Sequence, residues 1–107
     1  MKPARLAPEA AREVDEAAGW YESRQAGLAV RFLDEFDQIL SQIRRHPAAF
    51  PCLEDVPADL AVRRALMSRF PYGLIFLELS KDIRIVAVAH AKRRPGYWIH
   101  RIKAGFR

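Results

Sequence analysis

The stretch YGLIFLELSKDIRIVAVAH, residues 72–90, decides the fold of this 107-residue chain. Residues 72–79 are almost continuously large and apolar, which is typical of a strand covered on one face and crowded on the other. Residues 83–90 alternate, which predicts Ile83, Ile85, Ala87 and Ala89 on one side and Arg84, Val86, Val88 and His90 on the other. Because the Ser80-Lys81-Asp82 segment between them is short and polar, the stretch predicts an antiparallel β-hairpin.

Upstream of the hairpin, apolar residues recur at helical spacing and predict two helices. The two stripes are Ala10, Val14, Ala17, Ala18 and Tyr21, then Phe32, Phe36, Ile39, Leu40 and Ile43. Pro8 suits a first helical position, and Pro47 stops the second helix. The face of the second helix that is expected to meet solvent carries Arg31, Asp34, Glu35, Gln38 and Gln42. The linker from Ser23 to Gly27 is short enough to make the helices antiparallel.

Two further segments complete the expected sheet. Leu60 to Met67 predicts a strand whose alternation is interrupted by Arg63 and Arg64, and Met1 to Leu6 can add an edge strand. The fold class is therefore α+β, an N-terminal helical hairpin packed on a small, mainly antiparallel sheet of three to four strands. The length predicts a single domain over residues 1–107.

Several function classes find no support in the sequence. The apolar stretch from Ile85 to Ala89 is too short for a membrane span and the N-terminus lacks a signal-peptide core, so we expect a cytoplasmic protein without membrane contact. Scattered histidines and the absence of a glycine-rich motif predict no metal and no cofactor. Cys52, with His46 nearby, leaves open a Cys–His nucleophile, although an ordinary loop thiol is the more frequent interpretation.

Charge separates the two halves of the chain. Residues 1–60 hold seven Lys/Arg and eleven Asp/Glu, a net charge of −4. Residues 61–107 hold eleven Lys/Arg and two Asp/Glu, a net charge of +9. Such a basic half favours a polyanionic partner, either nucleic acid or an acidic polypeptide that covers the same surface.

The segment HAKRRPGYW, residues 90–98, concentrates the chemistry that binds such partners. Three consecutive cations neutralise phosphates or carboxylates, and guanidinium and aromatic planes stack on unpaired bases. The expected target-binding residues are Arg63, Arg64, Arg69, Lys92, Arg93 and Arg94. We expect Tyr97 to be partly exposed and Trp98 to close the core, and the core is predicted to include Phe32, Phe36 and Phe70.

The pattern His-x-Lys-Arg-x-Pro-x-Tyr-Trp after a strand resembles the RelE/ParE family of toxins from type II toxin–antitoxin systems. Further stretches match in order: Trp20-Tyr21-Glu22, Phe32, Pro47, Phe50-Pro51, Val62-Arg63-Arg64 and Arg69-Phe70-Pro71-Tyr72. The resemblance implies a helical hairpin against an antiparallel sheet, and a plasmid-stabilisation toxin neutralised by a cognate antitoxin protein.

The resemblance implies two alternative targets, and a third possibility lies outside the family. ParE-like members block DNA gyrase by binding, and this interpretation is slightly favoured. RelE-like members cleave mRNA on the ribosome, and by position Arg63, Arg93, Tyr97 and His90 are the candidate catalytic residues. Residues 60–80 contain no Lys, which departs from the ribosome-dependent nucleases. The third possibility is a non-toxic nucleic-acid-binding module.

Overall fold

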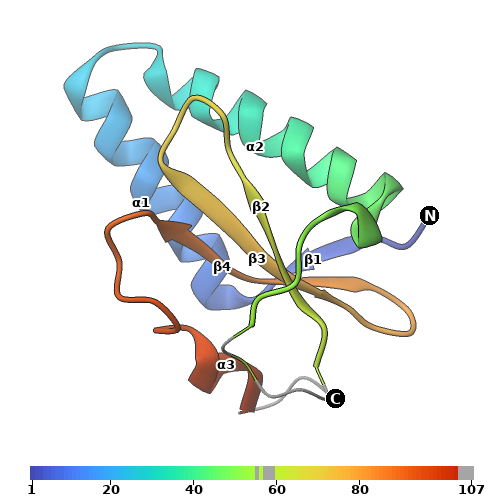
Figure 1. Ribbon diagram of the computed structural model, residues 1–107. Coiled ribbons are helices and arrows are strands. Elements are labelled where there is room, and N and C mark those ends of the chain that lie inside the picture. The colour runs from blue at the N-terminus through green and yellow to red at the C-terminus, as the bar shows by residue number, and fades with distance from the viewer. Residues whose placement is uncertain (55, 57–59, 104–107) are drawn as a thin grey trace.

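The computed structural model describes residues 1–54, 56 and 60–103. Its elements are β1 (Ala4–Leu6), α1 (Pro8–Arg24), α2 (Leu28–Arg45), a 3-10 turn η1 (Pro47–Ala49), β2 (Val62–Leu66), β3 (Tyr72–Glu78), β4 (Ile83–His90) and α3 (Ile99–Lys103). The four strands form one sheet in the order β1-β4-β3-β2 (Figure 1). The predicted α+β class and the helical hairpin are confirmed.

The sheet is mixed because one edge strand, β2, runs antiparallel to its neighbour, whereas the other edge strand, β1, runs parallel to its neighbour. β3 pairs antiparallel with both β2 and β4, which confirms the hairpin predicted from residues 72–90. β1 pairs parallel with β4, with Ala4 opposite Ile83. The expected edge strand is therefore present, and it adds one parallel pairing to an otherwise antiparallel sheet.

Both helices cover one face of the sheet and bury the predicted stripes (Figure 1). Phe32 and Phe36 are buried there, as expected. Phe70 is only half-buried, which corrects the prediction of a core position. It lies at the end of the layer, where its ring centroid is 5.2 Å from that of Phe32 and 4.8 Å from that of Tyr21.

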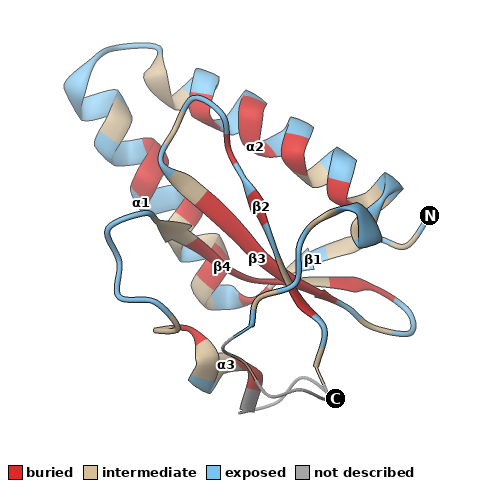
Figure 2. Cartoon of the chain, viewed as in Figure 1, coloured by how far each residue is buried: buried red, intermediate tan, exposed pale blue. Residues whose placement is uncertain are grey.

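The opposite face of the sheet carries a second apolar cluster that the sequence reading did not separate from the first. Trp98 and Ile102 from the C-terminal segment pack there against Ile75, Leu77 and Val86. The burial of Trp98 confirms the expected core position, whereas α3 was not predicted. The C-terminal segment therefore covers part of the sheet face that the helices leave open (Figure 2).

A β-bulge changes which way the second half of β4 faces. The pairing with β3 shifts between Ile75 and Phe76, so that Ile75 pairs with Ala87 while Phe76 pairs with Ile85, leaving Val86 extra. After such a bulge the alternation of side chains is reversed. Val88 consequently packs in the helix-side core with Ile83 and Ile85, and Ala87 in the opposite cluster. The predicted grouping of Ile83 and Ile85 with Ala87 is thus wrong.

Glu35, expected to face solvent on α2, is buried instead. Its carboxylate accepts hydrogen bonds from the Ser68 backbone N–H, from the Ser68 hydroxyl at 2.9 Å and from the Arg69 backbone N–H at 3.1 Å. These donors belong to the loop between β2 and β3. Because buried carboxylates need such partners, the loop and the helix fix one another.

Replacing Glu35 by Ala should lower the free energy of unfolding by about 1–3 kcal/mol, because two loop N–H groups lose a charged acceptor. Asp34→Ala, at the exposed neighbouring position, is the matched control and should change stability by no more than about 0.5 kcal/mol. Urea unfolding of the wild type and both variants measures the difference. Equal effects of the two substitutions would contradict this role of Glu35.

Candidate functional site

The basic turn, Lys92–Arg94, begins two residues after the end of β4 and is exposed to solvent. The backbone holds it at the end of the sheet. The Ala91 N–H donates to the Pro71 carbonyl at 2.8 Å, and the Lys92 N–H donates to Nδ1 of His90 at 3.0 Å. Three cations are therefore presented next to a rigid strand end, as expected for a surface that binds an anionic partner.

Behind the basic turn, Gly96 redirects the chain into α3. Its φ of +76° is in the left-handed region, and an added Cβ would lie 2.9 Å from Cδ1 of Ile99. This turn brings the Tyr97 ring under the Arg93 guanidinium, whose Cζ lies 3.8 Å from the ring centroid. Arg93 is thereby held by a cation–π contact rather than left fully mobile.

Glu13 of α1 joins the site to the helical hairpin, and the sequence reading did not single it out. Its carboxylate accepts hydrogen bonds from the Tyr97 hydroxyl at 2.6 Å, from both terminal nitrogens of Arg101 at 3.0 Å, and from the Val88 N–H at 2.9 Å. Arg101 also donates to the Val86 carbonyl at 3.0 Å. We call Glu13, Tyr97 and Arg101 the Glu13 clamp.

The contacts within the Glu13 clamp shift the pKa values of Glu13 and Tyr97. Burial alone would raise the pKa of Glu13, but the hydrogen bonds from Arg101, Tyr97 and Val88 outweigh it and lower the pKa. Burial and the Glu13 carboxylate raise the pKa of Tyr97 well above its ordinary value. Tyr97 therefore keeps its proton at neutral pH and donates it to a hydrogen bond with Glu13.

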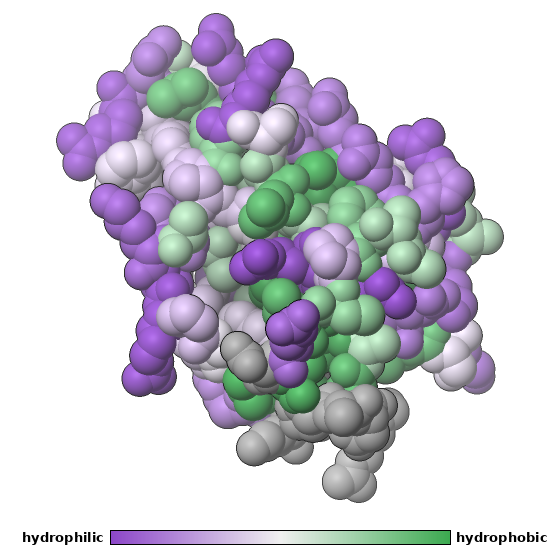
Figure 3. Space-filling view, in the orientation of Figure 1, coloured by the Kyte–Doolittle hydropathy of each residue, from purple (hydrophilic) through white to green (hydrophobic). Residues whose placement is uncertain are grey.

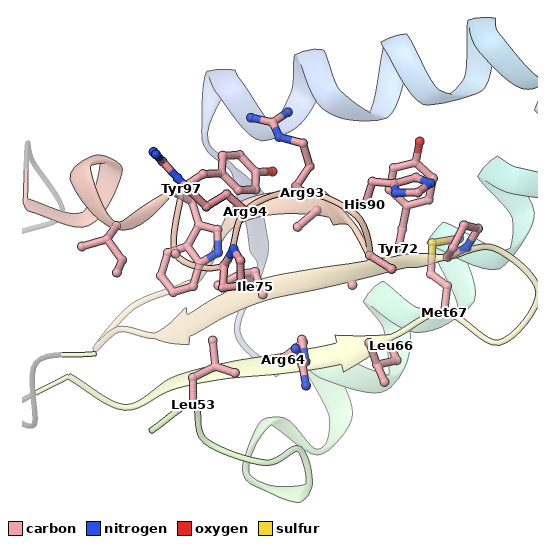
Figure 4. A pocket seen from close by; sticks show the side chains of 18 of the residues that line it. Leu53, Arg64, Leu66, Met67, Tyr72, Ile75, His90, Arg93, Arg94 and Tyr97 are labelled. Atoms are coloured by element: carbon pink, nitrogen blue, oxygen red, sulfur yellow. The ribbon is translucent and has the colours of Figure 1, made fainter. Parts of the chain in front are cut away.

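Beside the basic turn lies the sheet groove, a cavity of about 650 Å³ on the face away from the helices. Its apolar lining comes from β2, β3 and the segments before and after them, and includes Leu53, Leu66, Ile75 and Trp98. Arg64, Arg93 and Arg94 stand around it (Figure 4). The space-filling view shows hydrophobic surface over this face, crossed and bordered by hydrophilic groups (Figure 3).

The predicted target-binding residues do not form one patch. Arg64 stands in the sheet groove with Arg93 and Arg94, and its stem passes over Gly73. Arg63 is next along β2 and points to the other face, where its guanidinium donates to the Phe50 carbonyl at 2.6 Å. Arg69 is exposed on the loop between β2 and β3 and does not line the groove.

The four candidate catalytic residues are likewise divided. His90, Arg93 and Tyr97 line one cavity, whereas Arg63 is engaged with the η1 segment on the other side of the sheet. His90 accepts a backbone hydrogen bond through Nδ1 and its ring packs edge-on against Tyr72, with centroids 5.0 Å apart. The Tyr97 hydroxyl is directed to Glu13.

A metal site and a membrane-spanning helix find no support in the described residues. No group of three or more His, Cys, Asp or Glu side chains there could hold a metal ion, and no helix among them is long and apolar enough to cross a membrane. Cys52 is an exposed free thiol on the segment that bridges to Arg63, and in the described part of the chain no hydrogen bond joins it to His46.

Replacing Glu13 by Gln should lower the free energy of unfolding by about 1–3 kcal/mol at about pH 7, and the loss should shrink at about pH 3. The folded-state pKa of Glu13 lies below its ordinary value of 4.5, so its stabilisation is complete above that value. It is lost as the pH falls through the folded-state pKa. Urea unfolding across this range tests the sign, with exposed Asp15→Asn as control. A pH-independent difference would contradict the clamp.

Comparison with known proteins gives a consistent result. The profile of a family described as ParE toxin of type II toxin-antitoxin system, parDE, matches residues 4–95. A solved structure described as the chromosomal ParDE TA system from P. aeruginosa has a TM-score of 0.74 and 17% sequence identity, covering 86% of this chain and 98% of the other. No curated protein sequence matches significantly. The family match spans α1, α2 and all four strands, and the chain belongs to the ParE toxin family of type II toxin–antitoxin systems.

Proposed function

We propose that this ParE-family toxin inhibits growth in the cytoplasm by binding DNA gyrase, not by cleaving mRNA. One observation carries the choice between the two: the Arg63 guanidinium donates to the Phe50 and Ala48 carbonyls and does not line the cavity that holds His90, Arg93 and Tyr97. Cleavage of RNA without a metal requires a proton acceptor, a proton donor and a phosphate-stabilising cation converging within hydrogen-bond reach of one reacting phosphate.

The candidate catalytic residue Tyr97 also favours target binding over mRNA cleavage. Tyr97 has a raised pKa and gives its proton to a hydrogen bond with Glu13, so it is a poor proton acceptor. A surface that binds a protein target needs no such convergence, only exposed groups on a rigid support.

Induced expression of the chain alone should arrest growth and, if gyrase is the target, relax plasmid DNA before bulk mRNA is degraded. The variant with Lys92→Ala and Arg93→Ala should lose growth inhibition while its melting temperature stays within a few degrees, because exposed charges contribute little stability. The variant with Arg12→Ala and Lys81→Ala removes the same charge at exposed positions elsewhere and should remain toxic. Rapid mRNA cleavage with supercoiling intact would favour the RelE-like alternative, and tolerated expression would favour a non-toxic binding module.

We further propose that a cognate antitoxin neutralises the toxin by covering the sheet groove. The apolar lining of the groove includes Leu66 and Ile75, and Ile75, in the strand interior, is only 3% exposed. Arg64, Arg93 and Arg94 stand around these two residues. Leu66 is 64% exposed, an unusual state for a leucine on a strand. An acidic, amphipathic segment that folds on binding matches both features, since its apolar face covers Leu66 and its carboxylates meet the arginines.

The association rate with the protein encoded next to this one should fall steeply as salt rises, because the charges steer the encounter. The affinity should fall less, because apolar burial holds the formed complex. Stopped-flow association at several ionic strengths measures the first effect and titration calorimetry the second. A salt-independent association rate, or unchanged affinity in Leu66→Glu, would show that the antitoxin binds elsewhere.

A further inference from the structure

A second cavity, the aromatic pocket, lies between α1 and the ends of β3 and β4 and is not used by either proposal above. Its volume is about 340 Å³. Four rings line it, those of Trp20, Tyr21, Tyr72 and His90, together with the carboxylate-bearing residues Glu13 and Glu16. Arg93 reaches its rim from the basic turn.

The pocket is walled by aromatic rings that the fold holds in fixed positions. The ring centroids of Tyr21 and Tyr72 are 6.3 Å apart, and those of Tyr72 and His90 are 5.0 Å apart. Trp20 stands beside Tyr21 with centroids 5.1 Å apart and is 52% exposed. A tryptophan left this open contributes little to the core, so its surface remains available to a partner.

Guanidinium groups of this chain already pair with the rings around the pocket. The Cζ atom of Arg24 lies 4.7 Å from the Trp20 ring centroid, outside the pocket lining, and that of Arg93 lies 3.8 Å from the Tyr97 ring centroid. Aromatic faces attract such cations through their negative quadrupole. Of these two rings, Trp20 lines the pocket, and its exposed surface suits an arginine that arrives from another protein.

Charge at the pocket favours the same occupant. Glu16 is exposed and takes part in no ion pair within the described residues, whereas Glu13 is occupied by the Glu13 clamp. The free carboxylate lies one helical turn before Trp20 on α1, so a single guanidinium can stack on the indole and pair with Glu16. Arg93 lines the opposite side of the pocket and its guanidinium is stacked on the Tyr97 ring, so the attraction for an incoming cation lies at the Glu16 end.

We propose that the aromatic pocket binds an arginine side chain of a partner protein, stacked on Trp20 and paired with Glu16. The toxin then carries two recognition surfaces of opposite chemistry on either side of the basic turn. The sheet groove takes an acidic segment, and the aromatic pocket takes a basic side chain.

The test titrates the full chain with acetyl-Gly-Arg-Gly-amide and follows the two tryptophan indole N–H signals by ¹H–¹⁵N NMR. The chain has two tryptophans, of which Trp98 is buried, so each signal reports one environment. The Trp20 signal should shift saturably while the Trp98 signal stays. Acetyl-Gly-Gln-Gly-amide, which lacks the charge, should shift neither signal.

Glu16→Gln should weaken binding of the arginine peptide about two- to fivefold, whereas Asp15→Asn, an equal charge change at an exposed neighbouring position, should leave it unchanged. Trp20→Leu should abolish saturable shifts at the amide signals of Tyr21 and Tyr72. Equal weakening by Glu16→Gln and Asp15→Asn, a static Trp20 signal, or stronger shifts with adenosine monophosphate would overturn the proposal. None of these outcomes bears on growth inhibition, so failure here leaves the proposed function intact.

Discussion

The structure depends on providing hydrogen-bond partners for the backbone along one stretch of the edge of β4. β1 ends at Leu6, opposite Ile85, and beyond that point no strand among the described residues neighbours β4 on that side. The Val86 carbonyl and the Val88 N–H would be left without partners in a largely apolar setting, which costs free energy. Arg101 and Glu13 supply those partners, and they bind each other while doing so. One side chain from each end of the chain thus replaces a strand.

That replacement determines where the proposed binding surfaces lie. Because Arg101 is fixed to Glu13, Trp98 and Ile102 are held over the second apolar cluster and the basic turn is held at the end of β4. The bulge at Val86 contributes as well, since it turns His90 to the side of Tyr72 and the aromatic pocket. The sheet groove and the aromatic pocket adjoin one another, since His90, Arg93 and Tyr72 line both cavities.

Local patterns in the sequence predicted α1, α2 and the four strands, but neither α3 nor the contacts between distant elements. Period and turn residues were sufficient for the hairpin of residues 72–90 and for both helices, whose stripes bury as expected. The bulge was not predicted because it depends on the pairing of β4 with β3. The roles of Glu13 and Glu35 were not predicted because they depend on backbone N–H groups far along the chain. Two further features of the structure are indicated by patterns in the sequence. Strand alternation places Arg63 and Arg64 on opposite faces, and Trp98 and Ile102 are four residues apart, the spacing of one helical face. Glu13 also borders the buried residue Val14 on α1.

The parallel pairing of β1 with β4 has a consequence for how the toxin is made. The hairpin of β3 and β4 joins neighbouring residues and can form quickly, whereas β1 must wait for β4 and Glu13 must wait for Arg101, 88 residues later. Synthesis proceeds from the N-terminus, so the nascent helices exist for a time without the sheet that buries their apolar stripes. The basic turn therefore acquires its final shape only after nearly the whole chain has left the ribosome.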